Sequence, residues 1–147
     1  GFNLSSKVVY LTGLSGAVDF NYSRVRYLQA GNWFEEHMVN RWTGAVRVNK
    51  QFSAAKTTVS LHWKIFGPQE LPAGRSISES PIWQIYNLSV KKNFQNWQLG
   101  FDIENLFDWT QPDSPFINQN EGGLIDSALI YGPLIGRRFR LSLSFGL

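Results

Sequence analysis

The alternation of apolar and polar residues with a period of two is the feature that most constrains the fold of this chain. In residues 137–147, phenylalanine and leucine occupy every second position, with arginine, serine and glycine between them. Successive side chains of a β-strand point to opposite faces, so this segment is expected to form a strand with one apolar and one polar face. Six further segments repeat the pattern: 2–12, 18–23, 41–49, 57–65, 86–91 and 97–104. The sequence therefore predicts an all-β, antiparallel meander of about seven strands.

The connections between these segments alternate in length. Short turns are predicted at 13–16, 52–55 and 93–96, and long loops at 26–40, 67–81 and 108–136. The long loops hold all six prolines, which do not fit the interior of a sheet. One end of the sheet should therefore carry tight turns, and the other end should carry long loops.

Three features favour a membrane barrel over a soluble sheet. The predicted strands are about 10 residues long, which suits a tilted crossing of a bilayer. The six tryptophans fall mainly near strand ends, where aromatic girdles meet lipid headgroups, and so do four phenylalanines: Phe52, Phe66, Phe94 and Phe107. Short turns at one end and long loops at the other match the periplasmic and extracellular ends of such barrels. The apolar side chains Phe139, Leu141, Leu143 and Phe145 should then face lipid, and Arg138, Arg140, Ser142 and Ser144 should face the interior.

An odd number of strands has a consequence for closure. With the C-terminus on the short-turn side, seven strands place Gly1 on the long-loop side, whereas single-chain bacterial barrels have an even strand count and two periplasmic termini. The sequence therefore predicts that further strands come from the same protein, from another chain or from copies of this one. Segments 2–12 and 137–147 are expected to pair with such strands and not with each other.

Two motifs near the end of the chain resemble a known family. Residues 99–108, LGFDIENLFD, resemble the G-x-x-N-L-F-D penultimate strand of TonB-dependent outer-membrane receptors. Residues 131–139, YGPLIGRRF, resemble the x-G-P-x-x-G-R-x-[FY] ending common among such receptors in Bacteroidetes, and residues 65–72, IFGPQELP, fit a loop entrance in that group. The resemblance covers about the last two-thirds of the chain. The chain departs from the family in lacking the plug and the TonB-contacting box, and in ending at Leu147, two residues after its last aromatic.

The resemblance implies that residues 1–147 are the C-terminal part of a transmembrane β-barrel of about 22 strands, whose plug and upstream strands are absent from the chain. It implies active uptake of a scarce nutrient, such as a metal chelate, cobalamin or a glycan. It places the chain in the bacterial outer membrane, with long loops extracellular and short turns and the C-terminus periplasmic. The implied partners are the remaining strands and plug, TonB through the missing part, outer-membrane lipid and a surface lipoprotein.

No pattern in the sequence supports catalysis, a cofactor or a metal site, so the chain is not expected to be an enzyme. His62 lies on a polar strand face, and His37 follows two glutamates without a ligand spacing. Nucleic acid is not an expected partner, because the charges are scattered and the formal net charge is only +3. One loop is rich in oxygen-bearing side chains but lacks the spacing of a calcium loop. These residues are Asp113, Asn118, Asn120, Glu121 and Asp126.

Two groups of residues are candidates for function. The first comprises polar residues expected to face the barrel interior, where they contact a plug, line a substrate path or only pair with one another: Arg41, Arg47, His62, Lys64, Lys91, Asp102, Glu104, Arg138 and Arg140. Asp19 lies on the same face. The second comprises loop aromatics that can contact a substrate outside the membrane: Trp33, Phe34, Trp109, Phe116 and Tyr131.

Two other functions remain open at this point. The chain can be a structural barrel segment in a larger outer-membrane assembly, without a substrate of its own. It can also be a small independent barrel of about eight strands that binds through its long loops. A plug-like sequence upstream in the gene would favour the receptor, and a signal peptide just before Gly1 would favour the small barrel.

Overall fold

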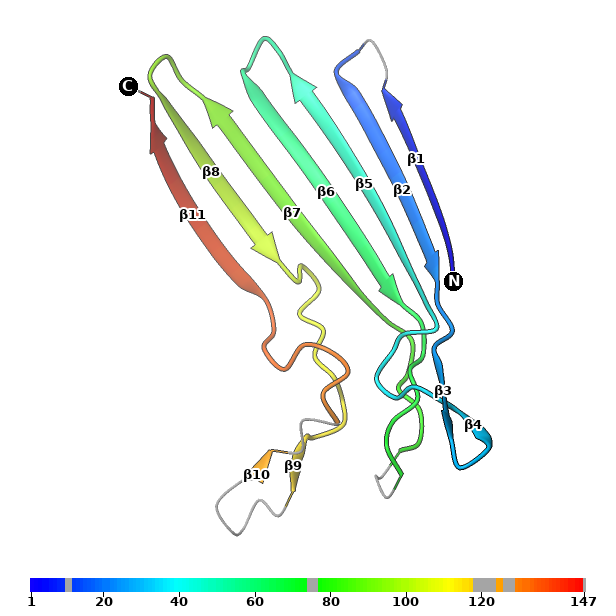
Figure 1. Ribbon diagram of the computed structural model, residues 1–147. Helices are drawn as coiled ribbons and strands as arrows, with labels where there is room; N and C mark the ends of the chain where they lie inside the picture. The colour runs from blue at the N-terminus through cyan, green and yellow to red at the C-terminus, as the bar shows by residue number, and fades with distance from the viewer. Residues whose placement is uncertain (10–11, 74–76, 118–123, 126–128, 147) are drawn as a thin grey trace.

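The computed structural model describes residues 1–9, 12–73, 77–117, 124–125 and 129–146. These residues form an all-β fold built around one antiparallel sheet of seven strands (Figure 1). The strands of this sheet are β1 (Phe2–Val9), β2 (Leu14–Tyr22), β5 (Trp42–Phe52), β6 (Thr57–Phe66), β7 (Trp83–Asn93), β8 (Trp97–Glu104) and β11 (Arg138–Phe145). Each strand pairs with the next one in this order, so the sheet is a simple meander.

All seven segments predicted from the period of two are strands of this sheet. The tight turns lie within a residue or two of their predicted places, except that residues 14–16 belong to β2 and not to a turn. Gly13 takes the turn position before β2, with a φ of 71°. A side chain there would place its Cβ 2.9 Å from the Gln51 carbonyl oxygen, so the close approach of the two strands favours glycine.

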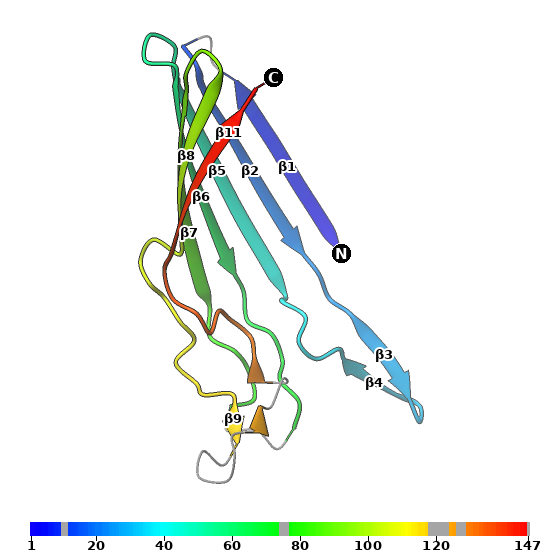
Figure 2. The ribbon, with the colours of Figure 1, turned by 90° about the vertical axis from the view of Figure 1, so that its left-hand side faces the viewer.

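The long connections contain structure that the sequence pattern did not predict. Residues 26–40, expected to be a loop, include a hairpin of β3 (Arg26–Gln29) and β4 (Asn32–Glu35). Its two turn residues, Ala30 and Gly31, have φ angles of 49° and 83°, as a type I′ turn requires. A second small hairpin pairs β9 (Phe116–Ile117) with β10 (Leu124–Ile125). Both hairpins extend beyond the long-loop end of the sheet and lie apart from each other (Figures 1 and 2).

The register of the strands gives the sheet one apolar and one polar face. Directly opposed residues share a face, and successive rows alternate between the two faces. The central apolar row contains Val8, Gly16, Val48, Leu61, Leu88, Ile103 and Phe139. The adjacent row is polar except for Val9 on β1, and contains Ser15, Asn49, Ser60, Ser89, Asp102 and Arg140.

The apolar face has no covering layer within the described part of the chain. Leu141 is 73% exposed, Phe145 is 72% exposed and Leu4 is 58% exposed. The buried hydrophobic residues lie elsewhere, at the long-loop end, and are Leu71, Trp83, Leu129 and Tyr131. An exposed apolar face that spans seven strands is far larger than the patches found on soluble monomers.

The sheet is open in this chain. β1 and β11 form its two edges and do not pair with each other in the described residues, which confirms that segments 2–12 and 137–147 do not close the sheet together. The C-terminus lies at the short-turn end, and Gly1 lies at the long-loop side of β1 (Figure 1). Both edges therefore present unpaired backbone N–H and C=O groups.

Candidate functional site

The polar face holds eight of the nine polar residues that the sequence predicted to face an interior. The strand pairing places Arg47 opposite His62, Lys64 opposite Ala45, and Lys91 opposite Thr58. Part of this face forms a shallow hollow of about 410 Å³. Its polar lining includes Arg47, His62, Lys91, Asp102 and Arg140.

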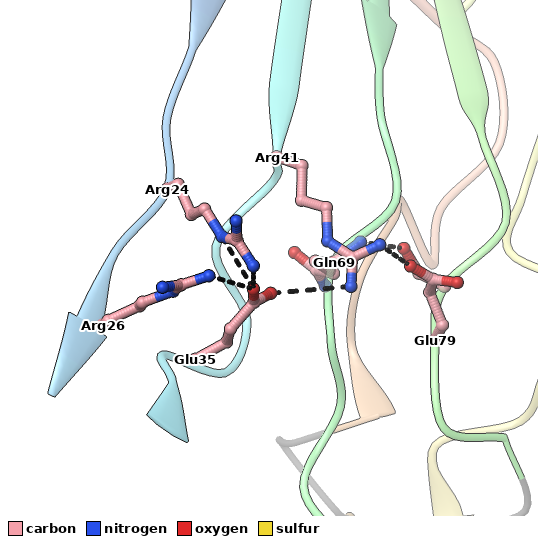
Figure 3. Close-up of polar contacts among 7 residues, drawn as sticks. Arg24, Arg26, Glu35, Arg41, Gln69 and Glu79 are labelled. Atoms are coloured by element: carbon pink, nitrogen blue, oxygen red, sulfur yellow. Dashed lines mark hydrogen bonds and ion pairs between the residues drawn. The ribbon is translucent and has the colours of Figure 1, made fainter. Parts of the chain in front are cut away.

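The ninth predicted residue, Arg41, lies elsewhere. It directly precedes β5 and belongs to an ion network at the long-loop end, which also contains Arg24, Arg26, Glu35 and Glu79 (Figure 3). Its guanidinium lies 3.6 Å from Glu35 Oε2 and 2.5 Å from Glu79 Oε1. Arg41 lies one residue before β5, and its pairing depends on loops that are distant in sequence.

Glu35 anchors the β3–β4 hairpin through three arginines. Arg24 donates to Glu35 Oε1 from its Nε at 2.8 Å, and Arg26 and Arg41 approach the same carboxylate. The hydrogen bond from Arg24 and the charges of the three arginines hold the pKa of Glu35 below its usual value. The network thus fixes the base of the hairpin and leaves its apolar side chains outside, with Trp33 66% exposed.

The charge pairing on the polar face is uneven. Glu104 on β8 binds both Arg138 and Arg140 of β11, at 2.5 Å and 2.8 Å. Asp19 accepts a hydrogen bond of 2.5 Å from Ser5 Oγ. These contacts tie β11 to β8 and β1 to β2, and they leave the central strands β5, β6 and β7 without an ion pair on this face among the described residues.

In the seven described strands, the polar groups of the apolar face lie toward its two ends. At the long-loop end, Trp63 Nε1 and the Tyr86 hydroxyl both lie within hydrogen-bond distance of Gln84 Oε1, at 3.1 Å and 3.3 Å. At the short-turn end, Lys50 Nζ lies 5.8 Å from the centre of the Phe52 ring and donates to the Thr12 carbonyl at 2.9 Å. The face is therefore aliphatic in the middle and amphipathic at both ends.

Lys92 completes the group at the short-turn end, with its Nζ 5.7 Å from the centre of the Phe94 ring. Lys50 and Lys92 are the only charged residues on the apolar face of the seven described strands. Gln84 and Lys92 are eight residues apart on β7. At about 3.3 Å per residue, that is about 26 Å along the strand.

Three aromatic residues predicted to lie in a girdle point to the other face. Phe66 and Trp83 are paired across β6 and β7, on the same face as His62, and their ring centres are 3.9 Å apart. Trp109 stacks on Trp83 at 5.3 Å. Together with Leu71, Leu129 and Tyr131, these rings form a core in which the long loops pack against the polar side of the sheet. Counting back from Leu88 in steps of two reaches Gln84, so the period of two places Trp83 on the polar face, and its position at a strand end does not indicate its face.

The loop aromatics divide into exposed and buried residues. Trp33 and Phe34 are exposed on the β3–β4 hairpin. Tyr131 is only 5% exposed, and Trp109 is partly buried against the core, so these two residues stabilise the packing of the loops. The side chain of Phe116 lies outside the described residues.

Gln111 joins the two halves of the last long loop, a role that sequence analysis missed. Its Nε2 donates to the carbonyls of Asp113 and Leu129, and its Oε1 accepts from the backbone N–H groups of Tyr131 and Gly132. The four contacts use every donor and acceptor of the amide. The Tyr131 hydroxyl donates to Asp113 Oδ2 at 2.5 Å, and burial together with this bond raises the pKa of Tyr131 to about 12.

The two motifs that carry the family resemblance are in contact. Asn105 has a φ of 56° and exchanges two hydrogen bonds with the backbone of Trp109, at 2.6 Å and 3.0 Å. Asp108 Oδ1 accepts a bond of 2.6 Å from the Arg137 N–H, and Gly136 leaves room for this carboxylate. The N-L-F-D and G-R-R segments therefore form one seam between the end of β8 and the start of β11.

The described residues contain no cluster of three or more side chains suited to a metal ion. His37 Nδ1 is buried without a hydrogen-bond partner there. Of the oxygen-rich loop, Asp113 bonds to Tyr131, while Asn118, Asn120, Glu121 and Asp126 lie outside the described residues.

Comparisons with protein-family models, curated proteins and solved structures found no match to this chain. None of the described residues forms a helix long and apolar enough to cross a membrane. The functional argument therefore rests on the two faces of the sheet, on the contacts of its loops and on the motif resemblance.

Proposed function

We propose that this chain is part of the β-barrel wall of a TonB-dependent outer-membrane receptor, which takes up a scarce nutrient such as a metal chelate, cobalamin or a glycan. The observation that carries the proposal is the banded apolar face. It is uncovered along the whole sheet, with exposed side chains at the edges and partly exposed ones in the centre, and it is aliphatic in the middle and bordered at both ends by aromatic rings with polar or cationic tips. Membrane barrels have an outer band of this kind, about 25 Å tall.

The exposure of this face separates the proposal from a soluble sandwich. A soluble sandwich covers its apolar face with a second sheet about 10 Å away. The described residues place no second sheet over the apolar face, and the long loops pack on the polar side instead, against Phe66 and Trp83. Lipid therefore satisfies the apolar face without a further protein layer.

In a bilayer, the open edges of β1 and β11 need further strands to pair with. An unpaired backbone group costs several kcal/mol in hydrocarbon, so a spanning sheet must close. The partners are the remaining strands of the barrel, with the plug on the polar side. Short turns and the C-terminus lie on the periplasmic side, and the long loops are extracellular.

The receptor class rests on the motif resemblance, which the contact between the two motifs supports. Asp108 of the first motif accepts the N–H of Arg137 and lies against Gly136 of the second, while Asn105 holds the turn before it through the backbone of Trp109. That seam positions the entry to β11 against β8, which gives a physical reason for the two motifs to occur together. TonB contacts the missing part of the receptor.

Nitroxide labels on neighbouring residues test the membrane assignment. The chain contains no cysteine, so Leu88→Cys and Ser89→Cys can each be labelled alone in the full-length protein, in phosphatidylcholine vesicles, once any cysteines outside this segment are replaced. Leu88 belongs to the central apolar row, and Ser89 belongs to the adjacent polar row. Oxygen, which concentrates in lipid, should relax the label at 88 more strongly, and a water-soluble nickel chelate should relax the label at 89.

The same measurement separates lipid from a protein cover. A label at 88 that neither oxygen nor nickel reaches would mean that protein covers the apolar face, and the membrane proposal would be wrong. A label at 88 that nickel relaxes would mean that this face is in water, with the same consequence.

A further inference from the structure

The net charge of the chain lies on the polar face of the sheet. The whole sequence has 14 basic and 11 acidic residues. Six of the basic residues and three of the acidic residues lie on this face, and the remaining eight of each sign cancel. The polar face therefore carries the full excess of +3.

Four of these cations have no carboxylate partner. Arg138 and Arg140 share Glu104, whereas Lys7, Arg47, Lys64 and Lys91 make no ion pair among the described residues. Only two carboxylates on the face, Asp19 and Asp102, are likewise without a cation. The unpaired charge is thus predominantly positive.

Three of the unpaired cations follow the central strands from one end to the other. Lys64 lies toward the long-loop end, Arg47 lies one row further, opposite His62, and Lys91 lies near the short turns. Lys64 and the residue opposite Lys91 are six positions apart on β6, or about 20 Å.

The residues opposite these cations are small or neutral. Arg47 faces Ala17, Lys64 faces Ala45, and Lys91 faces Gly100. These side chains leave Arg47 and Lys91 open on the hollow that Ser60, His62 and Ser89 also line, and Lys64 lies beyond its long-loop side. Hydroxyl and imidazole groups there can add hydrogen bonds to an oxyanion.

We propose that Lys64, Arg47 and Lys91 form a track that binds small anionic solutes bearing phosphate or carboxylate groups. This inference rests on the proposed function, because it makes the polar face the wall of a solute path. Arginine and lysine are the side chains suited to phosphate and carboxylate oxygens, and their placement along the strand direction lets an anion pass between neighbouring cations. The substrate of the receptor is then an anion, or a chelate with a negative charge.

Collisional quenching tests the track in the full-length protein. An uncharged bimane at Ser60→Cys reports on the hollow, and the ratio of its quenching by iodide to its quenching by neutral acrylamide measures the local attraction of anions. Replacing Arg47, Lys64 and Lys91 together by glutamine should lower this ratio about twofold at about 0.1 M salt, as three charges roughly 10 Å away would do. Pyrophosphate or citrate should displace iodide in the parent protein, and glucose should not.

A matched variant controls for net charge. Lys50→Gln, Lys56→Gln and Lys92→Gln together remove the same charge from outside the polar face, and the iodide ratio should stay unchanged. The proposed track is wrong if the iodide ratio falls equally in both triple variants, or does not fall in the variant of Arg47, Lys64 and Lys91. A bimane that neither quencher reaches also overturns it, because an acidic protein segment would then occupy the face.

Displacement by pyrophosphate alone assigns phosphate as the ligand group, and displacement by citrate alone assigns carboxylate. Failure of the track is distinguishable from failure of the proposed function. If the nitroxide at 88 lies in lipid but the iodide ratio does not change when the three cations are replaced, only the anion inference is wrong.

Discussion

Replacing Leu88 with arginine is expected to destabilise the sheet in a bilayer, whereas the same replacement of its neighbour Ser89 is not. Leu88 lies in the middle of the apolar band, four residues from Gln84 and four from Lys92 on β7. That is about 13 Å along the strand on each side, or about 10 Å of depth after a tilt of about 40°. Leu88 is therefore close to the expected midplane.

The magnitude follows from this depth. An arginine on the lipid face costs about 2–4 kcal/mol at the midplane. This cost corresponds to a roughly 30- to 1,000-fold loss in the folding equilibrium constant, at tenfold for each 1.4 kcal/mol. An arginine at Ser89 instead faces Ser60 and Asp102, whose carboxylate has no cation partner in the described residues. Val90→Arg should cost less than Leu88→Arg, because residue 90 is closer to the Lys92 end of the band.

Urea unfolding from phosphatidylcholine vesicles, followed by tryptophan fluorescence, measures the three variants of the full-length protein. The expected order of destabilisation is Leu88→Arg, then Val90→Arg, then Ser89→Arg. Equal effects at 88 and 89 would refute the assignment of faces. Equal effects at 88 and 90 would refute lipid as the cause, since a protein cover has no gradient with depth.

Three further predictions concern the loops and the edges. Tyr131→Phe should remove the phenolate absorbance step near pH 12. The stability that the neutral Tyr131 contributes in the parent protein is complete below pH 10 and is lost as the pH rises toward about 12. Glu35→Gln should speed tryptic cleavage at the β3–β4 hairpin at neutral pH, and the control Glu36→Gln should not. In the parent protein, acid should speed cleavage there by pepsin, because the contribution of a carboxylate with a lowered pKa is lost as the pH falls through that value. Residues 1–147 expressed alone should give no heat-modifiable, SDS-resistant band, because β1 and β11 leave two open edges, and such a band from a monomer would refute this.

The sequence by itself determined the seven strands and their two faces. The period of two is a local property of the backbone, so Phe139 and Arg140 must point to opposite sides wherever β11 lies. The alternation of short and long connections was equally local, because glycine and proline set turns through their own φ angles. These signals needed no knowledge of distant contacts.

Only the tertiary structure decided how the loops pack. Phe66 and Trp83 lie at strand ends and were expected in a girdle, yet they turn to the polar face and pack with Leu129 and Tyr131, which lie more than 40 residues further along the chain. Arg41 was expected on a strand face, and it pairs instead with Glu35 and Glu79. Aromatic rings and guanidinium groups have several suitable partners, and the choice among them depends on which loops meet.

The unpaired charge of the polar face depends on both the sequence and the tertiary structure. The identities of Arg47, Lys64 and Lys91 as polar-face residues follow from the sequence. Their lack of carboxylate partners follows from the register, which sets Ala17, Ala45 and Gly100 opposite them and gives Glu104 to the two arginines of β11. Register depends on pairing between strands, and a shift of one residue would move every side chain to the other face, so only the assembled sheet determines which charges remain free.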